Sequence, residues 1–285
     1  MKNFKVKHYV SYIGVGVFAL IFTVLTFTTG LPQSTLYLLE KIAISIILAV
    51  SLSLVVGFLG ELSLGHAGFM CVGAYLGGKM SVILEAAMGR GSVAALLLSM
   101  VVGGLAAAIC GLVIGLPALR LKGDYLAIVT LAFGEIVRSV FQNSSDQSFG
   151  GALGLATPRF NKNYLFIIAF IMVLVTLAVV QNLMRSKHGR AITAIRDNEI
   201  AARATGVNVT KYKLLAFIIS ACFAGIAGVL FSYSQTKVQS STFDFNYSID
   251  ILVMVVLGGM GSINGSVLAA ALISYLNVEL SSVLT

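Results

Sequence analysis

Few residues in this sequence of 285 amino acids have the types and spacing that catalysis needs. The three histidines, His8, His66 and His188, are far apart, and neither the zinc-protease motif H-E-x-x-H nor the nucleophile motif G-x-S-x-G occurs. The Asp, Glu, His and Cys residues do not cluster with the spacing of metal ligands. The sequence therefore predicts a protein that is not an enzyme and has no metal or other cofactor.

One segment has the spacing of a nucleotide-binding loop. Residues Gly73 to Met80 fit the pattern G-x-x-x-x-G-K, but Met80 replaces the Ser or Thr that would hold Mg²⁺. We interpret this match as a coincidence. If the chain takes part in a process that needs energy, such as transport, the energy would then come from an ion gradient or from a separate subunit that binds ATP.

Charged residues inside apolar runs are a second set of candidates, because a charge at membrane depth is costly and is often functional. Glu61 lies at a glycine-rich interruption, and Glu135 precedes Arg138 by three residues. For Glu135 and Arg138 the favoured interpretation is an ion pair on one helix, near the outer membrane interface. The alternative is an ion-coupling site at Glu61 or Glu135.

The elements that must position these residues are apolar helices. The chain is 58% hydrophobic and 11% charged, with a mean hydropathy of +0.97, whereas soluble domains are about 25% charged. Spans need roughly 20 apolar residues. The sequence predicts an all-α, polytopic transmembrane bundle of about 8–10 spans, as a single domain over residues 1–285. The candidate spans are 9–29, 37–57, 65–84, 92–117, 124–141, 163–183, 213–234, 248–262 and 265–283.

Two glycine-rich interruptions resemble each other weakly. They are Gly60–Gly68, in the glycine-interrupted segment 57–84 that is the weakest candidate, and Gly258–Gly265. Such a pair is typical of broken or re-entrant helices that meet at a substrate path, with Ser63 and Ser262 offering hydroxyl groups. The alternative is ordinary packing between helices through small residues. We expect at least one broken or re-entrant helix.

The basic residues predict the orientation. The net charge of +8 does not indicate nucleic-acid binding, because the basic residues lie at the ends of apolar runs. With a cytoplasmic N-terminus and alternating spans, most of the 19 Lys and Arg residues fall inside, as the positive-inside rule requires. The residues placed inside are Lys2, Lys5, Lys7, Arg120, Lys122, Arg185, Lys187, Arg190, Arg196, Arg203, Lys211 and Lys213.

The loop at 184–213 contains a predicted amphipathic helix. The segment from Arg190 to Thr205 is rich in helix-forming residues, and Gly206 provides a stop. Its apolar face is formed by Ile192, Ile195 and Ala202, with Ile200 near the edge, and its polar face by Arg196, Glu199 and Arg203. The helix either lies on the bilayer surface or docks a cytoplasmic partner.

Five blocks in order make the chain resemble LivM-type permeases, the membrane subunits of branched-chain amino acid ABC importers (the LivH/LivM family). The resemblance runs from about residue 37 to residue 280. The blocks are Gly60–Tyr75 (GELSLGHAGFMCVGAY), Leu119–Ile136, Gly150–Leu155 (GGALGL), Gly189–Gly206 (GRAITAIRDNEIAARATG) and Val255–Gly265 (VVLGGMGSING).

The resemblance implies a permease of the cell (cytoplasmic) membrane that imports branched-chain or related amino acids. Its implied partners are a second, LivH-like permease chain, two cytoplasmic ATPases that bind the ATP, and an extracytoplasmic substrate-binding protein. The resemblance implies that the residues that couple this chain to the ATPases are Gly189, Arg190, Ile195, Arg196, Glu199, Arg203 and Gly206. The first and fifth blocks place a substrate path at Ser63, Gly65, His66, Gly68, Phe69, Gly258, Gly259, Gly261 and Ser262.

Three alternatives remain open at this point. One is an ion-coupled secondary transporter of small polar solutes. Another is an ABC permease of the same family for urea or other amides. The third is a membrane enzyme, against which the missing catalytic motifs argue.

Overall fold

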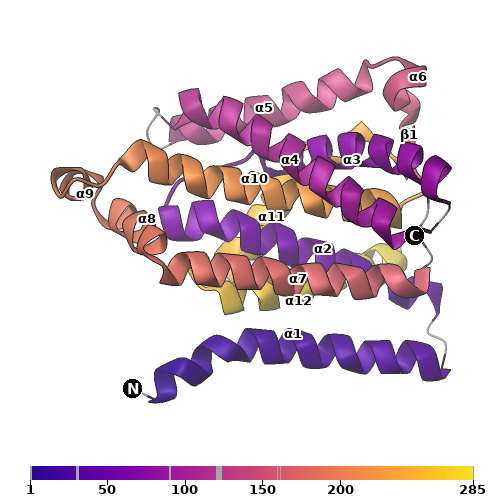
Figure 1. Cartoon of the computed structure of the whole chain (residues 1–285), viewed down its shortest axis with the longest axis horizontal. Helices are drawn as coiled ribbons and strands as arrows, with labels where there is room; N and C mark the ends of the chain where they lie inside the picture. The colour runs from indigo at the N-terminus through magenta and orange to yellow at the C-terminus, as the bar shows by residue number, and fades with distance from the viewer. Residues whose placement is uncertain are drawn as a thin grey trace.

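The computed structural model describes residues 2–29, 32–89, 91–119, 124–158, 160 and 162–284. The predicted Arg120 and Lys122 lie outside them. The long helices form a bundle (Figure 1). They are α1 (Lys2–Thr29), α2 (Gln33–Ser53), α3 (His66–Met88), α4 (Val93–Ala118), α5 (Asp124–Gln142), α7 (Lys162–Arg185), α10 (Val209–Ser234), α11 (Phe245–Leu257) and α12 (Ile263–Leu284).

The prediction of a polytopic helical bundle is confirmed. In the part of the chain that the structure describes, seven helices are long and apolar enough to cross a membrane. Shorter apolar helices lie at Ile13–Thr26 and at Phe245–Leu257. Each predicted span corresponds to a helix, although α11 ends at Leu257 and not at residue 262.

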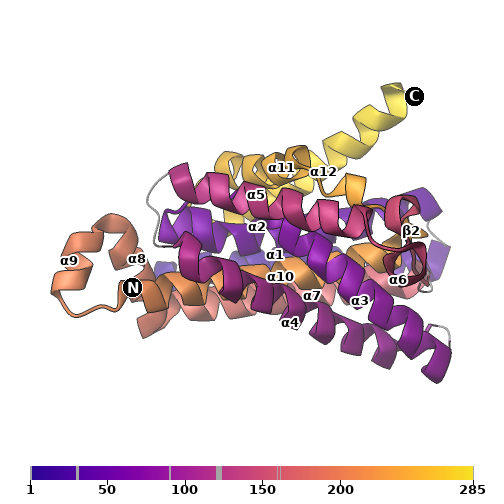
Figure 2. The ribbon, with the colours of Figure 1, turned by 90° about the horizontal axis from the view of Figure 1, so that it is seen from above.

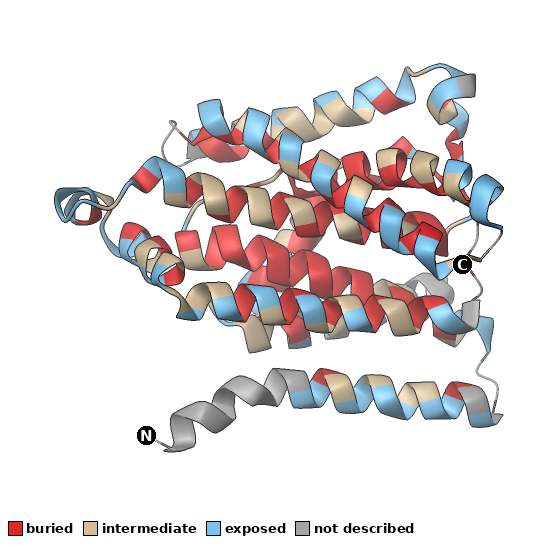
Figure 3. Ribbon diagram, viewed as in Figure 1, coloured by how far each residue is buried: buried red, intermediate tan, exposed pale blue. Residues whose placement is uncertain are grey.

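Helix α2 forms the centre of the bundle and is almost entirely buried (Figure 3). It contacts α7, α10, α11 and α12, whereas α1 lies beside α7 and α12 at the edge (Figure 1). A second group consists of α3, α4 and α10, which approach closely through glycines. A Cβ atom at Gly225 of α10 would lie 2.6 Å from the Gly103 carbonyl oxygen of α4. Small residues allow this approach, as in other membrane bundles.

The first glycine-rich interruption lies before α3 and not within it. A π-helix, η1 (Leu54–Leu59), extends α2, Gly60 follows with φ +79°, and residues 60–65 are not helical. The expected broken helix in this glycine-rich segment is confirmed, with a single break, because α3 is continuous from His66 onward. Gly73 of α3 instead packs against the backbone of Gly225.

The non-helical segment 60–65 folds back into the bundle and is called the re-entrant segment below. The residue after this segment, His66, forms a 2.9 Å hydrogen bond through its ring with the Ser51 hydroxyl of α2. Ser51 lies eight residues before Leu59, the last residue of η1. At about 1.5 Å per residue, α3 therefore begins roughly 12 Å inside the end of the bundle. Ser63 and Gly65 are buried there, which fits the rule that irregular backbone at membrane depth is surrounded by protein.

Short elements occupy the two ends. At one end, α8 (Lys187–Asp197) and α9 (Glu199–Ala204) protrude beyond the long helices (Figure 2). At the other end lie the short helix α6 (Asp146–Phe149) and two 3₁₀ turns, which are η2 (Gly151–Leu153) and η3 (Ser240–Thr242). Two short strands, β1 (Leu155–Ala156) and β2 (Lys237–Val238), pair antiparallel at the same end. The Tyr75 hydroxyl of α3 donates to the Val238 carbonyl oxygen at 3.1 Å. This second end is called the β-ribbon end below.

Candidate functional site

The predicted amphipathic helix is two helices. The Ser186 hydroxyl caps α8 by accepting from the backbone N–H groups of His188 (3.1 Å) and Gly189 (3.4 Å). The prediction of one helix from Arg190 to Thr205 is wrong, because Asn198 has extended backbone (φ −159°) and accepts from the Ala201 N–H at 3.0 Å. Asn is a favoured N-cap, so α9 starts anew there. The predicted glycine stop is present, since Gly206 has φ +85°.

The apolar face of this segment anchors it to the bundle. Ile192, Ile195 and Ala202 are buried, as expected for that face, and they form a small second core. The other members of this core are Leu54 and Leu59 of η1 and Val209 and Ala216 of α10. Ile200 points away from it and is 82% exposed. The segment is thus fixed to η1 and α10 and presents one large apolar side chain to the outside.

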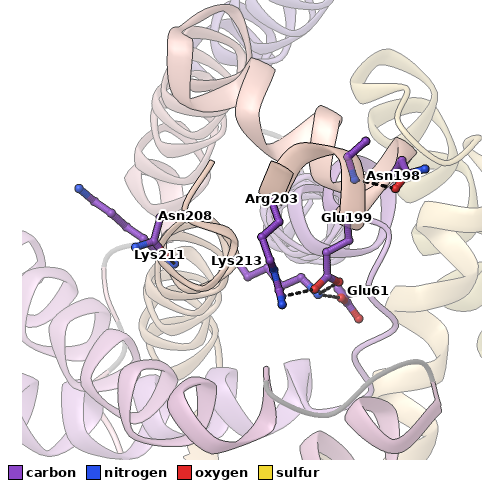
Figure 4. A network of polar contacts seen from close by, with 8 residues as sticks. Glu61, Asn198, Glu199, Arg203, Asn208, Lys211 and Lys213 are labelled. Carbon is purple, nitrogen blue, oxygen red and sulfur yellow. Dashed lines mark hydrogen bonds and ion pairs between the residues drawn. The ribbon is translucent and has the colours of Figure 1, made fainter. Parts of the chain in front are cut away.

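A buried cation binds three elements together. The Lys213 side chain of α10 is 4% exposed and pairs with Glu61 of the re-entrant segment and with Glu199 Oε2 of α9, the latter at 3.0 Å. The other oxygen of Glu199 pairs with Arg203 at 2.9 Å. Figure 4 shows Lys213 between the two carboxylates, with Arg203 beside Glu199. Two cations and two carboxylates balance in this cluster, called the Lys213 network below, as buried ions require.

Arg196 of α8 lies where the two glycine-rich interruptions meet. Its Nη1 donates to the Gly57 carbonyl oxygen at 2.9 Å, at the end of η1, where a cation is favourable. Its methylenes cover Gly60, where a Cβ would lie 2.7 Å from Arg196 Cγ. A Cβ at Gly57 would lie 2.6 Å from the Gly261 nitrogen, and one at Gly261 3.3 Å from Arg196 Nη1. Arg196 therefore contacts both interruptions.

Of the predicted path residues, the first five lie at the buried start of α3. Gly65 and Gly68 pack against Thr130 and Gly134 of α5. The ring of Phe69 lies between Phe133 and Phe217, with centroids 4.8 and 5.5 Å away.

Two side-chain hydroxyl groups accept hydrogen bonds from the backbone around the start of α3. Ala67 N–H donates to Ser248 Oγ of α11 at 3.2 Å, and Leu64 N–H donates to Thr130 Oγ1 at 3.0 Å. Leu64 precedes α3 and Ala67 is in its first turn, so neither N–H group has a partner within the helix, and the hydroxyl groups satisfy both.

The other four path residues form the turn between α11 and α12, at the end where α8 lies. Gly259 and Gly261 have positive φ, Gly258 packs against Gly265, and the Ser262 hydroxyl accepts from the Gly265 N–H at 3.2 Å. Gly261 and Ser262 also line a cavity of about 320 Å³ with Phe58, Gln181, Met184, Arg185, Ile263 and Asn264. The residues at the start of α3 do not line this cavity, so the nine residues form two separate groups.

Sequence reasoning missed the partners of two charged residues. Glu61 drew attention as an acid in apolar surroundings, but its partner Lys213 was counted only as an orientation signal. The two are 152 positions apart, and no local spacing could join them. By contrast, the pair predicted from spacing is confirmed, because Arg138 Nη2 lies 2.7 Å from Glu135 Oε2.

Comparison with known proteins gives the class of this membrane bundle. Residues 34–285 match the family described as branched-chain amino acid transport system / permease component. The chain belongs to this family and is a multi-pass membrane protein.

Three relatives are LivM permease proteins of branched-chain amino acid transport. The chain is 38% identical over 262 residues to the high-affinity branched-chain amino acid transport system permease protein LivM of Salmonella typhimurium, and 38% identical over 261 residues to that of Escherichia coli. Each match covers 81% of this chain and 60% of the relative. A probable LivM of Methanocaldococcus jannaschii is 31% identical over 173 residues, covering 56% of this chain and 50% of that protein. No solved structure matches the chain.

Proposed function

We propose that this chain is the permease subunit of an ABC importer that moves branched-chain or related amino acids into the cell. The observation that carries the proposal is the anchored α8–α9 segment. Its buried side is joined to both glycine-rich interruptions, and its other side presents Ile200 to a partner. Family membership and the LivM relatives support the substrate class.

The proposed orientation places α8 and α9 in the cytoplasm. Seven Lys and Arg residues lie between Arg185 and Lys213, and α1 begins at the same end of the bundle (Figure 1). The positive-inside rule favours this arrangement. The β-ribbon end then faces outward, where an extracytoplasmic binding protein would deliver the substrate.

The proposed partners are consistent with the same arrangement. Two ATPases would dock on the α8–α9 segments of this chain and of a second, LivH-like permease chain. The exposed side of α9 has an apolar side chain, Ile200, beside the Glu199–Arg203 ion pair. A short helix with a central apolar residue and a polar rim suits a groove in a partner protein.

Movement of the ATPases would reach the spans through two connections. Lys213 joins α9 to the re-entrant segment and α10, and Arg196 joins α8 to the end of η1 and to the α11–α12 turn. A displacement of α8 and α9 therefore acts on both interruptions at once. ATP is bound by the partners, and this chain has no cofactor of its own in the proposal.

Reconstitution tests the proposal. The chain, its second permease, the ATPases and the binding protein are placed in liposomes with radiolabelled leucine on the β-ribbon side. We expect uptake only with ATP on the α8–α9 side, and competition by isoleucine or valine. Uptake of solute by this chain alone under a sodium or proton gradient would instead identify a secondary transporter. Competition by urea but not by isoleucine would identify an amide permease.

A further inference from the structure

A row of polar residues borders the exposed apolar face of α5 along half of the helix. Glu135, Arg138, Ser139 and Gln142 follow the spacing i, i+3, i+4 and i+7, which places them on one face of a helix. Ser139 and Gln142 are exposed, and the side chains of Glu135 and Arg138 are 37% and 31% exposed. These four residues are called the α5 stripe.

The neighbouring helix α4 shows what a lipid-facing surface of this bundle looks like. Its exposed residues are all apolar from one end to the other. They are Val93, Ala94, Leu97, Leu98, Val101, Leu105, Ile109, Leu112, Val113, Leu116 and Pro117. Against that surface, an exposed ion pair followed by a hydroxyl and an amide is inconsistent with contact to lipid chains.

The depth of the pair excludes a simple position at the membrane surface. Glu135 lies seven residues before the end of α5, or roughly 10 Å inside it at about 1.5 Å per residue. Arg138 is nearer the end, and a long basic side chain can reach outward to the interface. Here, however, Arg138 turns inward and holds Glu135 at 2.7 and 2.9 Å. The two charges therefore remain at membrane depth.

We infer that the α5 stripe is a wet wall of the substrate path, at which Arg138 receives the carboxylate and Glu135 the ammonium group of a zwitterionic amino acid. The inference rests on the proposed function, in which a second permease chain closes the path. A zwitterion exchanges the ion pair for two new ones, so neither charge of the protein is left unpaired. The guanidinium of Arg138 suits a carboxylate by its planar fork of donors.

The surroundings of the pair suit a branched apolar side chain. Ile136 and Val140, also on α5, are 62% and 61% exposed beside the stripe. A substrate held by its charged groups at Glu135 and Arg138 can lay its hydrocarbon part on these residues. The site is open, which suits transport, because the ligand must leave as readily as it arrives.

Thiol labelling tests whether the stripe is wet. In the assembled importer, with Cys71, Cys110 and Cys222 replaced by Ala, we compare Ser139→Cys and Gln142→Cys with Ile109→Cys, which is 60% exposed on α4. A membrane-impermeant methanethiosulfonate reacts with the thiolate, which forms in water and not in lipid. We expect the α5 thiols to react more than about tenfold faster than the α4 thiol, and leucine with its binding protein to slow them. Equal, slow labelling of all three would overturn the inference.

Transport kinetics test the two charges separately. Because Arg138→Gln removes the charged donor for the substrate carboxylate, it should raise the KM for leucine at least about tenfold. The matched control is the exchanged pair Glu135→Arg with Arg138→Glu, which keeps an i, i+3 ion pair but reverses its direction. Normal transport by the exchanged pair would mean that the two residues only stabilise α5. If the wild-type complex transports no amino acid, the proposed function fails, whereas the labelling result still decides whether the stripe is wet.

Discussion

The Lys213 network and the Glu135–Arg138 pair both contain charged residues of apolar helices, but they differ in burial and in range. Lys213 is 4% exposed and joins α10 to two other segments, whereas Glu135 and Arg138 belong to one helix and are about one-third exposed. A buried ion needs its partners for stability, because their loss leaves an uncompensated charge. An exposed pair contributes little to stability and remains available to a ligand. The first is therefore structural and connective, and the second is suited to binding.

Lys213→Ala should have the largest effect on stability. It leaves Glu61 and Glu199 close together without their shared cation, and breaking a buried pair in this way costs about 3 kcal/mol. Thermal unfolding of the purified protein in detergent should give a clearly lower Tm than that of Lys211→Ala, an exposed lysine two residues away. Equal Tm values for the two variants would mean that Lys213 is not the structural centre of the network.

Arg196→Ala should destabilise the protein less than Lys213→Ala does. The expected loss of stability is about 1–2 kcal/mol, because the substitution removes one hydrogen bond to a partly buried carbonyl oxygen. The Gly57 carbonyl oxygen loses its 2.9 Å donor, and the two interruptions lose their shared contact. In the reconstituted importer, we expect ATP hydrolysis to continue with less leucine carried per ATP. Lys187→Ala, which changes an exposed residue of the same helix to which no coupling role is assigned, is the control. An unchanged ratio of transport to hydrolysis for Arg196→Ala would contradict the connection.

Glu135→Gln should lower the stability by only about 0.5 kcal/mol, as for other exposed ion pairs. It should nevertheless impair transport. This is the reverse of the pattern expected for Lys213, where stability changes first. Differential scanning fluorimetry and leucine uptake are measured on the same preparation. A fall in Tm as large as that of Lys213→Ala would remove the distinction between the two regions.

Ile200→Asp should have the smallest effect on the fold, within about 0.5 kcal/mol, because a surface substitution removes few contacts. Ile200 is 82% exposed, whereas Ile195 on the same segment is 4% exposed. Copurification should nevertheless show loss of the ATPases, since a charge would enter the proposed groove. Ile195→Asp is the comparison, and it should lower the Tm. Retention of the ATPases by Ile200→Asp would place the docking surface elsewhere.

Local patterns predicted much of the site. The spacing of apolar residues identified Ile192, Ile195 and Ala202 as the buried face, Gly206 ended the segment as expected, and the i, i+3 spacing identified the Glu135–Arg138 pair. These features depend on residues within one or two turns of each other. The bend at Asn198 was missed although its signal was present, because Asn can cap a new helix as well as continue the old one. The docking and substrate roles of these residues stay predictions.

The sequence by itself determined the class of the fold. Its apolar runs have to be helices that span a bilayer, since only hydrogen bonds within the helix satisfy the backbone in lipid. Only the tertiary structure decided that Glu61 pairs with Lys213, that Arg196 joins both interruptions, and that α3 begins inside the bundle at His66. Such contacts depend on which helices pack together, and packing between apolar helices is set by shape along whole surfaces rather than by a residue and its neighbours in the sequence.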